Sequence, residues 1–405
     1  MLAMYQIYFS FDNVSVVGWA ALAVAALCVI WLLTAYRLRV LLPASVARRQ
    51  MAKAAAVPEE GAGNSPAVPD VSVIVYGTGN VEGLEKLLGQ LATQEYQGKV
   101  EIVVVNDGTS GEMSDVVTRF GIFNPGKEVY YTYVPDGARN LSRKKLCISL
   151  GVKAARHEVV VLTTSDCTLP GPRWLSRMTA PLAEGKDVAL GVARFGHLTS
   201  ATDRFDEVAT TVGWLTQAIK GHPYRGCGFN LAYRRQLFFD VKGFADSLRL
   251  HFGDDDLFVN RIATRQNTAV VLGRDTVVKV DTPAPAAAFR EQRLRHMFTG
   301  RRLRGAWRPR LFFGCSTIMM WVWLAATAAC IVLTLPNALP GCVAVALIPA
   351  LWIPLCAAWR RTGKSMGVLL CRSLLPWNMM TRWARQLVWS IVCGLPSRKN
   401  YTWRS

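Results

Sequence analysis

The stretch VSVIVYGTGNVEGLEKLLGQLATQEYQGKVEIVVVNDG, residues 71–108, is the most informative part of the chain for its architecture. It opens with a β-rich run at 71–76 and closes with a second such run at 100–106. Between them, leucines recur at the i, i+3, i+4, i+7 spacing of one helix face, at Leu84, Leu87, Leu88 and Leu91. This order of strand, helix and strand predicts a βαβ unit with parallel strands.

The same alternation continues along the chain. Strand-like runs lie at 128–134 and 158–165, and a basic helical segment lies between them at about 142–155. The pattern predicts an α/β domain with a mostly parallel sheet covered by helices on both faces. The sequence contains no Gly-x-Gly-x-x-Gly and no P-loop pattern, which argues against a dinucleotide oxidoreductase and a P-loop NTPase.

Ligands bind beyond the carboxyl ends of strands in such sheets. Tyr76, Asp107 and Asp166 end or follow three of the predicted strands, so they are candidate site residues. The plain structural explanation for an aspartate at these places is a turn or a helix cap.

Two further motifs gather charge in the second half of the chain. Asp254, Asp255 and Asp256 precede an apolar helical run, where acids also simply favour a helix N-terminus. On a helix, Gln292, Arg295 and His296 share one face, although plain juxtamembrane charge also explains such a segment.

Long uncharged segments predict a membrane protein. Residues 13–36 and 311–359 carry no charge, and Pro336, Asn337, Pro340 and Gly341 divide the second segment into a hairpin of about 311–334 and 342–359. A cleaved signal peptide and a buried core hairpin are the competing interpretations. Residues 366–396 interleave Trp with Arg and predict an interfacial amphipathic helix, or a third C-terminal span.

The net charge of +19 is concentrated beside these apolar segments, which favours a membrane anchor with cytoplasmic flanks over a nucleic-acid-binding protein. The 10 cysteines form no CxxC pair, so we expect reduced thiols and no structural zinc. We divide the chain into an N-terminal transmembrane helix (1–36), a basic juxtamembrane segment and linker (37–69), a catalytic-type α/β domain (70–290), a basic interfacial helix (291–310), a transmembrane hairpin (311–359) and a basic amphipathic segment at the membrane surface (360–405).

Taken together, VSVIVY, EIVVVNDGTS, RKKLCISLGVKAA, VLTTSDC, GCGFNLAYRR, GDDDLFV and QRLRH resemble, in order and spacing, the motifs of family 2 glycosyltransferases with a GT-A fold. The match runs from Val71 to about Arg304. The resemblance implies a Rossmann-like, mostly parallel sheet and a nucleotide-sugar donor.

On the donor side, the resemblance places Tyr76, Asp107 and Ser165 at the nucleotide sugar, with Lys144 or Lys145 near the phosphates. The family's metal motif has two aspartates separated by one residue.

Here Thr164 stands in the first position of that motif, so Asp166 is the expected ligand of a weakened Mg²⁺ or Mn²⁺ site. On the acceptor side, the resemblance implies Asn230, Gln292, Arg295 and His296, with His296 replacing the usual Trp. The base motif makes Asp255 the catalytic base, with Asp254 beside it.

The resemblance therefore implies an inverting glycosyltransferase of polysaccharide biosynthesis in the inner membrane, with a cytoplasmic catalytic domain. Its partners would be a nucleotide sugar, a lipid-linked or growing glycan acceptor, and membrane lipids. The alternatives are a polyprenyl-phosphate glycosyltransferase, a catalytically inactive glycosyltransferase-like subunit, and a basic scaffold for anionic lipids. The oligomeric state stays open.

Overall fold

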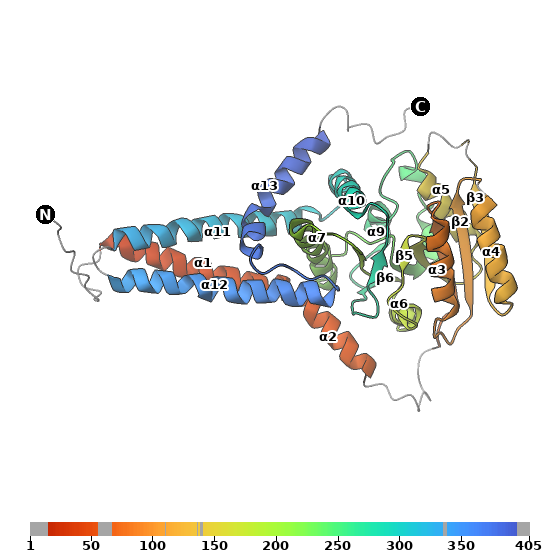
Figure 1. Ribbon diagram of the computed structural model, residues 1–405, viewed down its shortest axis with the longest axis horizontal. Helices are drawn as coiled ribbons and strands as arrows, with labels where there is room; N and C mark the ends of the chain where they lie inside the picture. Colours follow the sequence, from red (N-terminus) through yellow and green to blue (C-terminus); the bar gives the residue numbers. More distant parts are fainter. Residues whose placement is uncertain are drawn as a thin grey trace.

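The computed structural model describes residues 15–55, 67–109, 111–135, 137, 141–334 and 338–394. A bundle of long helices projects from a rounded α/β domain (Figure 1). The domain contains a seven-stranded sheet in the order β3-β2-β1-β4-β8-β6-β9 and a small sheet in the order β5-β10-β7.

Parallel pairing dominates the large sheet. Its strands are β1 (Val71–Gly77), β2 (Val100–Asp107), β3 (Glu128–Val134), β4 (Val159–Thr164), β6 (Val188–Leu190), β8 (Leu231–Arg234) and β9 (Thr268–Val270). The pairs of β1 with β2, β1 with β4, β2 with β3 and β6 with β9 are parallel, whereas β8 runs antiparallel to both neighbours. The predicted α/β architecture is confirmed. The small sheet consists of β5 (Cys167–Thr168), β7 (Ala193–Phe195) and β10 (Val278–Val280).

Helices cover both faces of the large sheet because its strands are apolar on both sides. The side chains of Val71, Val73 and Val75 join the core formed with α3 (Val81–Ala92), α4 (Gly111–Phe123) and α6 (Trp174–Ala183). Ile74 points to the other face, toward α5 (Arg143–Ala154). There, a Cβ on Gly151 would lie 2.6 Å from Ile74 Cγ2, so the glycine permits the close approach of helix and strand.

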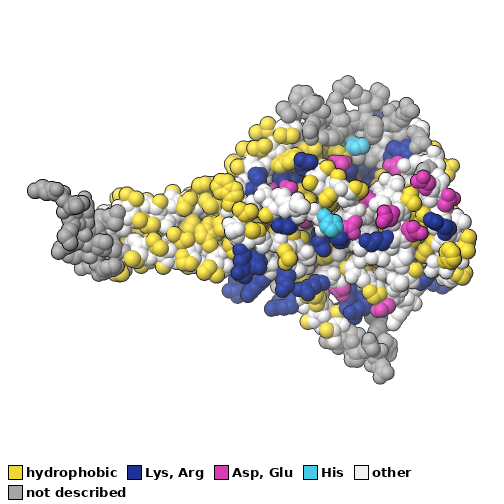
Figure 2. Space-filling view, viewed as in Figure 1, with side chains coloured by type: hydrophobic (Ala, Val, Ile, Leu, Met, Phe, Trp, Pro, Cys, Tyr) yellow, Lys and Arg dark blue, Asp and Glu magenta, His cyan; other side chains and the backbone are white. Residues whose placement is uncertain are grey.

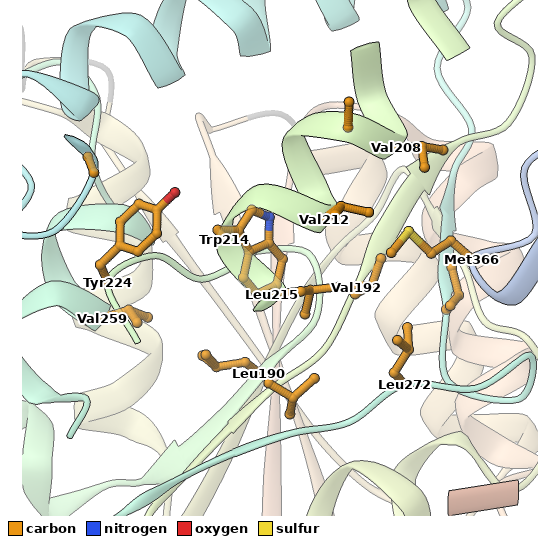
Figure 3. Close-up of a cluster of buried hydrophobic side chains, with 14 of the residues drawn as sticks. Leu190, Val192, Val208, Val212, Trp214, Leu215, Tyr224, Val259, Leu272 and Met366 are labelled. Atoms are coloured by element: carbon orange, nitrogen blue, oxygen red, sulfur yellow. The ribbon is translucent and has the colours of Figure 1, made fainter. Parts of the chain in front are cut away.

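Helix α7 (Ala201–Ile219) joins the sheet core to the membrane bundle. Figure 3 shows Val212 and Leu215 of α7 pointing into the cluster that contains Leu190 and Val192. Met366, which follows the last bundle helix, lies in the same cluster. One continuous apolar core therefore fixes the domain against the bundle.

The bundle consists of α1 (Val16–Arg39), α11 (Trp307–Leu333) and α12 (Ala338–Ser365). Within the described ranges, three helices are long and apolar enough to cross a membrane. Figure 2 shows the hydrophobic surface of this stalk and the Lys and Arg side chains that gather where it meets the domain. The chain is therefore a membrane-associated protein.

Aromatic rings close the domain end of the bundle. Tyr36 packs against Phe312 and Trp359, and Trp359 also contacts Phe205 of α7 with ring centroids 4.9 Å apart. Helix α12 continues to Ser365, six residues past the expected end at 359, so its basic end belongs to the same helix. The expected turn at 335–341 lies partly outside the described residues, and residues 1–14 lie entirely outside them.

Two flanking helices change the expected organisation. Within the predicted basic juxtamembrane segment and linker (37–69), residues 41–55 form the helix α2 (Leu41–Ala55), which contacts the domain. Gln50 Nε2 donates to Val270 O at 2.6 Å, and its Oε1 accepts from Leu272 N at 2.8 Å. Residues 56–66 lie outside the described part of the chain.

At the other end, α10 (Pro285–Gly300) precedes the bundle and α13 (Leu375–Gly394) follows it. Helix α13 buries Leu375, Met379 and Arg382 and exposes Trp377 and Trp383, as expected for an amphipathic helix. The remaining short elements are α8 (Gln236–Asp240), a 3₁₀ turn (Ala245–Ser247) and α9 (Asp256–Ile262).

Candidate active site

A cavity of about 400 Å³ lies at the carboxyl ends of the parallel strands, where the topology predicts a ligand site. The ends of β1, β2 and β4 supply Tyr76, Asp107 and Thr164. The opposite wall comes from the 251–256 segment and from α10.

Asp107 stands at the centre of a polar group on one side of the cavity. Tyr76 Oη donates to Asp107 Oδ2 at 2.8 Å, and Arg143 Nε donates to Asp107 Oδ1. Burial and the neighbouring Asp107 carboxylate raise the pKa of Tyr76, so its phenol stays a hydrogen-bond donor. Sequence reasoning missed Arg143, although it is the first residue of the RKK motif.

The two candidate lysines have different places. Lys144 lines the cavity, and its Nζ lies 2.5 Å from Asp254 Oδ2. Lys145 is fully buried and donates to the carbonyl oxygens of Ser247, Leu250 and Phe252 at 2.6–3.1 Å. Its assignment to the phosphates is therefore corrected, because these three carbonyls take its three ammonium protons.

Neighbouring residues at the end of β4 have different environments. Asp166 and Thr164 line the cavity, and Asp166 Oδ1 accepts from Asn80 Nδ2 at 2.8 Å. Ser165 is fully buried and does not line the cavity, so its expected contact with the nucleotide is also corrected. Its Oγ instead accepts from Thr78 N at 3.0 Å and thereby positions Thr78, which does line the cavity.

Among the described residues, no group of three or more His, Cys, Asp or Glu could hold a metal ion. The cavity offers the Asp166 carboxylate beside the Thr164 hydroxyl. This donor set fits Mg²⁺ or Mn²⁺ only as a partial site, which substrate phosphate oxygens and water would complete.

The three consecutive aspartates have three different environments. Although burial raises the pKa of Asp254, the adjacent Lys144 ammonium holds it below its ordinary value. Asp256 is buried, lies 3.0 Å from Arg225 Nε and accepts from Thr299 Oγ1 at 2.7 Å. Both of these carboxylates are therefore held by a cation.

Asp255 differs because, among the described residues, its oxygens accept hydrogen bonds from backbone groups alone, Gly228 N at 3.0 Å and Asp256 N at 2.7 Å. Burial and the neighbouring Asp254 carboxylate raise the pKa of Asp255. Burial also raises the pKa of Asp256, to about 7, but that carboxylate is paired with Arg225 and accepts from Thr299. Asp255 forms no ion pair among the described residues, so it is the candidate for accepting a proton.

Helix α10 brings Gln292, Arg295 and His296 to the cavity, as their common helix face predicts. Arg295 Nη2 donates to Glu291 Oε1 at 2.5 Å, and its guanidinium lies 5.2 Å from the centre of the Phe252 ring. Burial, Arg225 and Arg295 hold the pKa of His296 well below its ordinary value, so its imidazole is neutral.

Asn230 is not at the cavity. It is fully buried, accepts from Trp174 Nε1 at 3.1 Å and donates to Val192 O and Thr276 O. The expected contact with an acceptor is corrected, because all of its polar atoms serve internal hydrogen bonds.

Sequence reasoning also missed several other lining residues, among them Phe195, Phe229, His251, Phe252 and Thr299. Phe229 lies within the GCGFNLAYRR motif, whereas Phe195 and Thr299 belong to no quoted motif and reach the cavity only through the fold. Phe252 had the clearest signal, since it directly precedes the acidic run.

The comparisons with known proteins agree with this geometry. Residues 71–239 match the model of the family Glycosyl transferase family 2. No curated protein matched the chain. A mannosyltransferase from Pyrobaculum calidifontis, solved with GDP-Man and Mn²⁺, is 19% identical with a TM-score of 0.51 and aligns over 93% of this chain and 99% of its own.

Two other solved structures are more distant. S. aureus TarS is 16% identical with a TM-score of 0.39, over 73% of this chain and 55% of its own. Glucosyl-3-phosphoglycerate synthase from Mycobacterium tuberculosis is 13% identical with a TM-score of 0.36, over 57% and 80%. The fold comparison therefore rests on the mannosyltransferase, and the match to glycosyl transferase family 2 covers residues 71–239. The chain is a membrane-associated glycosyltransferase with a GT-A fold.

Proposed function

We propose that this glycosyltransferase moves a sugar, with inversion, from a nucleotide-sugar donor to a lipid-linked or growing glycan acceptor. The reaction would take place at the cytoplasmic face of the inner membrane. The observation that carries the proposal is the Asp255 carboxylate at the cavity, which has a raised pKa and forms no ion pair among the described residues, together with the Asp107 and Arg143 pair in the same cavity.

The two ends of the cavity suit the two substrates. Asp107, held by Tyr76 and Arg143, offers carboxylate oxygens to the hydroxyl or amide groups of a nucleoside. Lys144 and Arg295 supply positive charge between this end and the acidic run. Preformed cations stabilise the negative charge that develops on a leaving diphosphate.

In the chemical step, Asp255 would take the proton of the acceptor hydroxyl as its oxygen attacks the anomeric carbon. The bond from that carbon to the diphosphate oxygen breaks, and the nucleoside diphosphate leaves with the electron pair. Attack on the face opposite the leaving group inverts the anomeric centre. A Mg²⁺ or Mn²⁺ ion, held by Asp166 and the donor phosphates, would neutralise charge on the leaving group as a Lewis acid.

The orientation in the membrane follows from charge. Basic residues lie at the domain ends of two bundle helices. They are Arg37 and Arg39 at the end of α1 and the arginines of 301–310 at the start of α11. Basic flanks remain in the cytoplasm, so the domain would lie there and the far end of the bundle outside.

A screen of nucleotide sugars against the full-length protein in detergent tests the donor assignment. The cognate donor should raise the unfolding temperature, because a ligand at 100 times its Kd adds about 2.7 kcal/mol of stability. The same donor should stabilise the Asp107→Ala variant much less. Stabilisation by no nucleotide sugar, or equal stabilisation of that variant, would contradict the proposal.

A further inference from the structure

A second, smaller cavity of about 80 Å³ adjoins the active-site cavity and shares His296 with it. It lies among α7, α10, α13 and the start of α11, which Figure 1 shows gathered at the domain end of the bundle. Its lining contains four arginines, Arg225, Arg293, Arg310 and Arg382, and one carboxylate, Asp206. Nothing in the proposed chemical step uses this cavity.

Its positive charges outnumber the carboxylates that could balance them. Asp206 is shared by three guanidiniums, at 3.0 Å from Arg293, 2.9 Å from Arg385 and 3.8 Å from Arg382, and Arg293 also lies 3.8 Å from Asp203. Arg225 is paired with Asp256, which belongs to the neighbouring site. Arg382 is only 3% exposed and its Nε makes no hydrogen bond in the described part of the chain. A buried cation that shares its counter-charge with two other guanidiniums is incompletely balanced, so the cavity is electrostatically suited to an anion.

The backbone at Gly300 lets two of these side chains converge. A Cβ at this position would lie 2.4 Å from Arg310 Nη2 and 3.9 Å from Arg225 Nη2. Arg310 is exposed and forms no ion pair with any carboxylate among the described residues. The planar guanidinium fork matches phosphate oxygens in pairs, which makes phosphate the best-fitting anion.

The position of the cavity indicates a lipid as the source of that phosphate. Arg310 belongs to the first turn of α11, a helix apolar enough to cross a membrane, and Arg382 belongs to the amphipathic α13. Side chains at the end of a spanning helix lie at the depth of lipid headgroups.

We propose that this arginine cavity binds the phosphate or diphosphate of a lipid-linked sugar acceptor, whose sugar then reaches past His296 to Asp255. The inference rests on the proposed function and narrows its acceptor. A sugar hydroxyl needs a base such as Asp255, whereas the oxygen of a lipid monophosphate is already ionised and needs none. The separation of the cavity from Asp255 therefore favours an acceptor with a sugar between its phosphate and the reacting oxygen.

The test uses the full-length protein in a non-ionic detergent and farnesyl diphosphate as the probe, with binding measured by calorimetry. Arg310→Gln should weaken binding at least about tenfold, because a charged hydrogen bond contributes about 1.5–3 kcal/mol. Arg310→Lys, which keeps the charge but loses the fork, should bind with intermediate affinity. Arg308→Gln is the matched control, since it removes the same charge two residues away and does not line the cavity.

Two further measurements test whether the bound phosphate belongs to a lipid and whether it binds in the arginine cavity or in the active-site cavity. Farnesol and inorganic pyrophosphate should bind much more weakly than farnesyl diphosphate. Arg143→Gln should weaken the binding of a nucleoside diphosphate and leave the binding of farnesyl diphosphate unchanged. Arg310→Gln should weaken the binding of farnesyl diphosphate and leave the binding of the nucleoside diphosphate unchanged.

Unchanged farnesyl diphosphate binding in Arg310→Gln would overturn the inference, as would loss of that binding in Arg143→Gln. The inference would also be overturned if pyrophosphate bound as tightly as farnesyl diphosphate and with the same dependence on Arg310, which would indicate a site for free phosphate. The same result with phosphatidylglycerol vesicles would indicate a site for bulk lipid. These failures leave nucleotide-sugar stabilisation of the wild type intact, so they are distinguishable from failure of the proposed function.

Discussion

The Nζ atom of Lys144 lies 2.5 Å from Oδ2 of Asp254, whereas the adjacent Asp255 forms no ion pair in the described part of the chain. Lys144 lies on α5 and Asp254 lies just before α9, so the pair joins the donor side of the cavity to its acidic run. Asp254 keeps its negative charge, and that charge raises the proton affinity of Asp255. This arrangement assigns different roles to adjacent, chemically identical side chains.

Replacement of Asp255 by Asn should lower kcat by about 10²–10⁴-fold, the usual contribution of a general base. Nucleotide binding should stay near wild type, because the base acts on the acceptor in the transition state. Steady-state kinetics and nucleotide calorimetry on the same preparation measure both effects. Turnover that is retained in Asp255→Asn would assign the base to Asp254 or Asp256, or exclude this mechanism.

The raised pKa of Asp255 also predicts a pH dependence. The carboxylate must be ionised to accept a proton, so kcat/KM should fall as the pH drops through the pKa of Asp255. The acid limb of the profile should therefore lie above about 4, the ordinary value for aspartate. Lys144→Gln removes a cation that favours ionised Asp255, so it should move this limb to higher pH. An acid limb at or below 4 would exclude Asp255 as the titrating base.

The single carboxylate at the end of β4 predicts that metal and donor bind together. Asp166 offers one charged ligand and Thr164 a neutral hydroxyl, so the donor-free protein should bind Mg²⁺ or Mn²⁺ weakly. Coupling is reciprocal, so metal and nucleotide sugar should raise each other's affinity by the same factor. Calorimetry should find tighter metal binding without donor in Thr164→Asp. Asp166→Ala should lose the metal's effect on donor affinity. Tight metal binding by the donor-free wild type would place the ion elsewhere.

Glu207, buried on α7, should make stability depend on pH. Burial raises its pKa to about 8, against 4.5 in the unfolded chain, although Phe195 N donates to its Oε1 at 2.7 Å. Between these two values the folded state binds more protons than the unfolded state, so stability falls as the pH rises. Glu207→Gln removes this penalty and should raise the unfolding temperature by a few degrees near pH 8. The difference in unfolding temperature between Glu207→Gln and the wild type should become smaller below pH 5. Equal pH dependence of the two proteins would show that Glu207 is not protonated in the fold.

Two cysteines test the proposed orientation. Cys342 is exposed near the start of α12, and Cys371 follows the other end of that helix. In intact cells, a membrane-impermeant maleimide should label Cys342 and not Cys371. The Cys342→Ser variant should lose that labelling. Labelling of Cys342 only after the membrane is opened would reverse the orientation.

Local patterns in the sequence determined the sheet, the spanning helices and the order of the motifs. Continuous β-branched runs specify strands buried on both faces, and the leucine spacing of 84–91 specifies one helix face, because both depend only on neighbours in the chain. The same reasoning placed Gln292, Arg295 and His296 together on α10. It also located the apolar segments of α1, α11 and α12, since their length and lack of charge need no tertiary partner.

Only the tertiary structure decided between residues that look alike in sequence. Lys144 and Lys145 are adjacent and chemically identical, but one faces the cavity and the other binds carbonyls about 100 residues away. Asn230 and Ser165 belong to the expected motifs, and yet distant backbone groups take their hydrogen bonds. The arginine cavity combines α7, α10, α11 and α13, which lie far apart in the chain. Burial and the choice of partner depend on how distant segments pack, and no local periodicity contains that information.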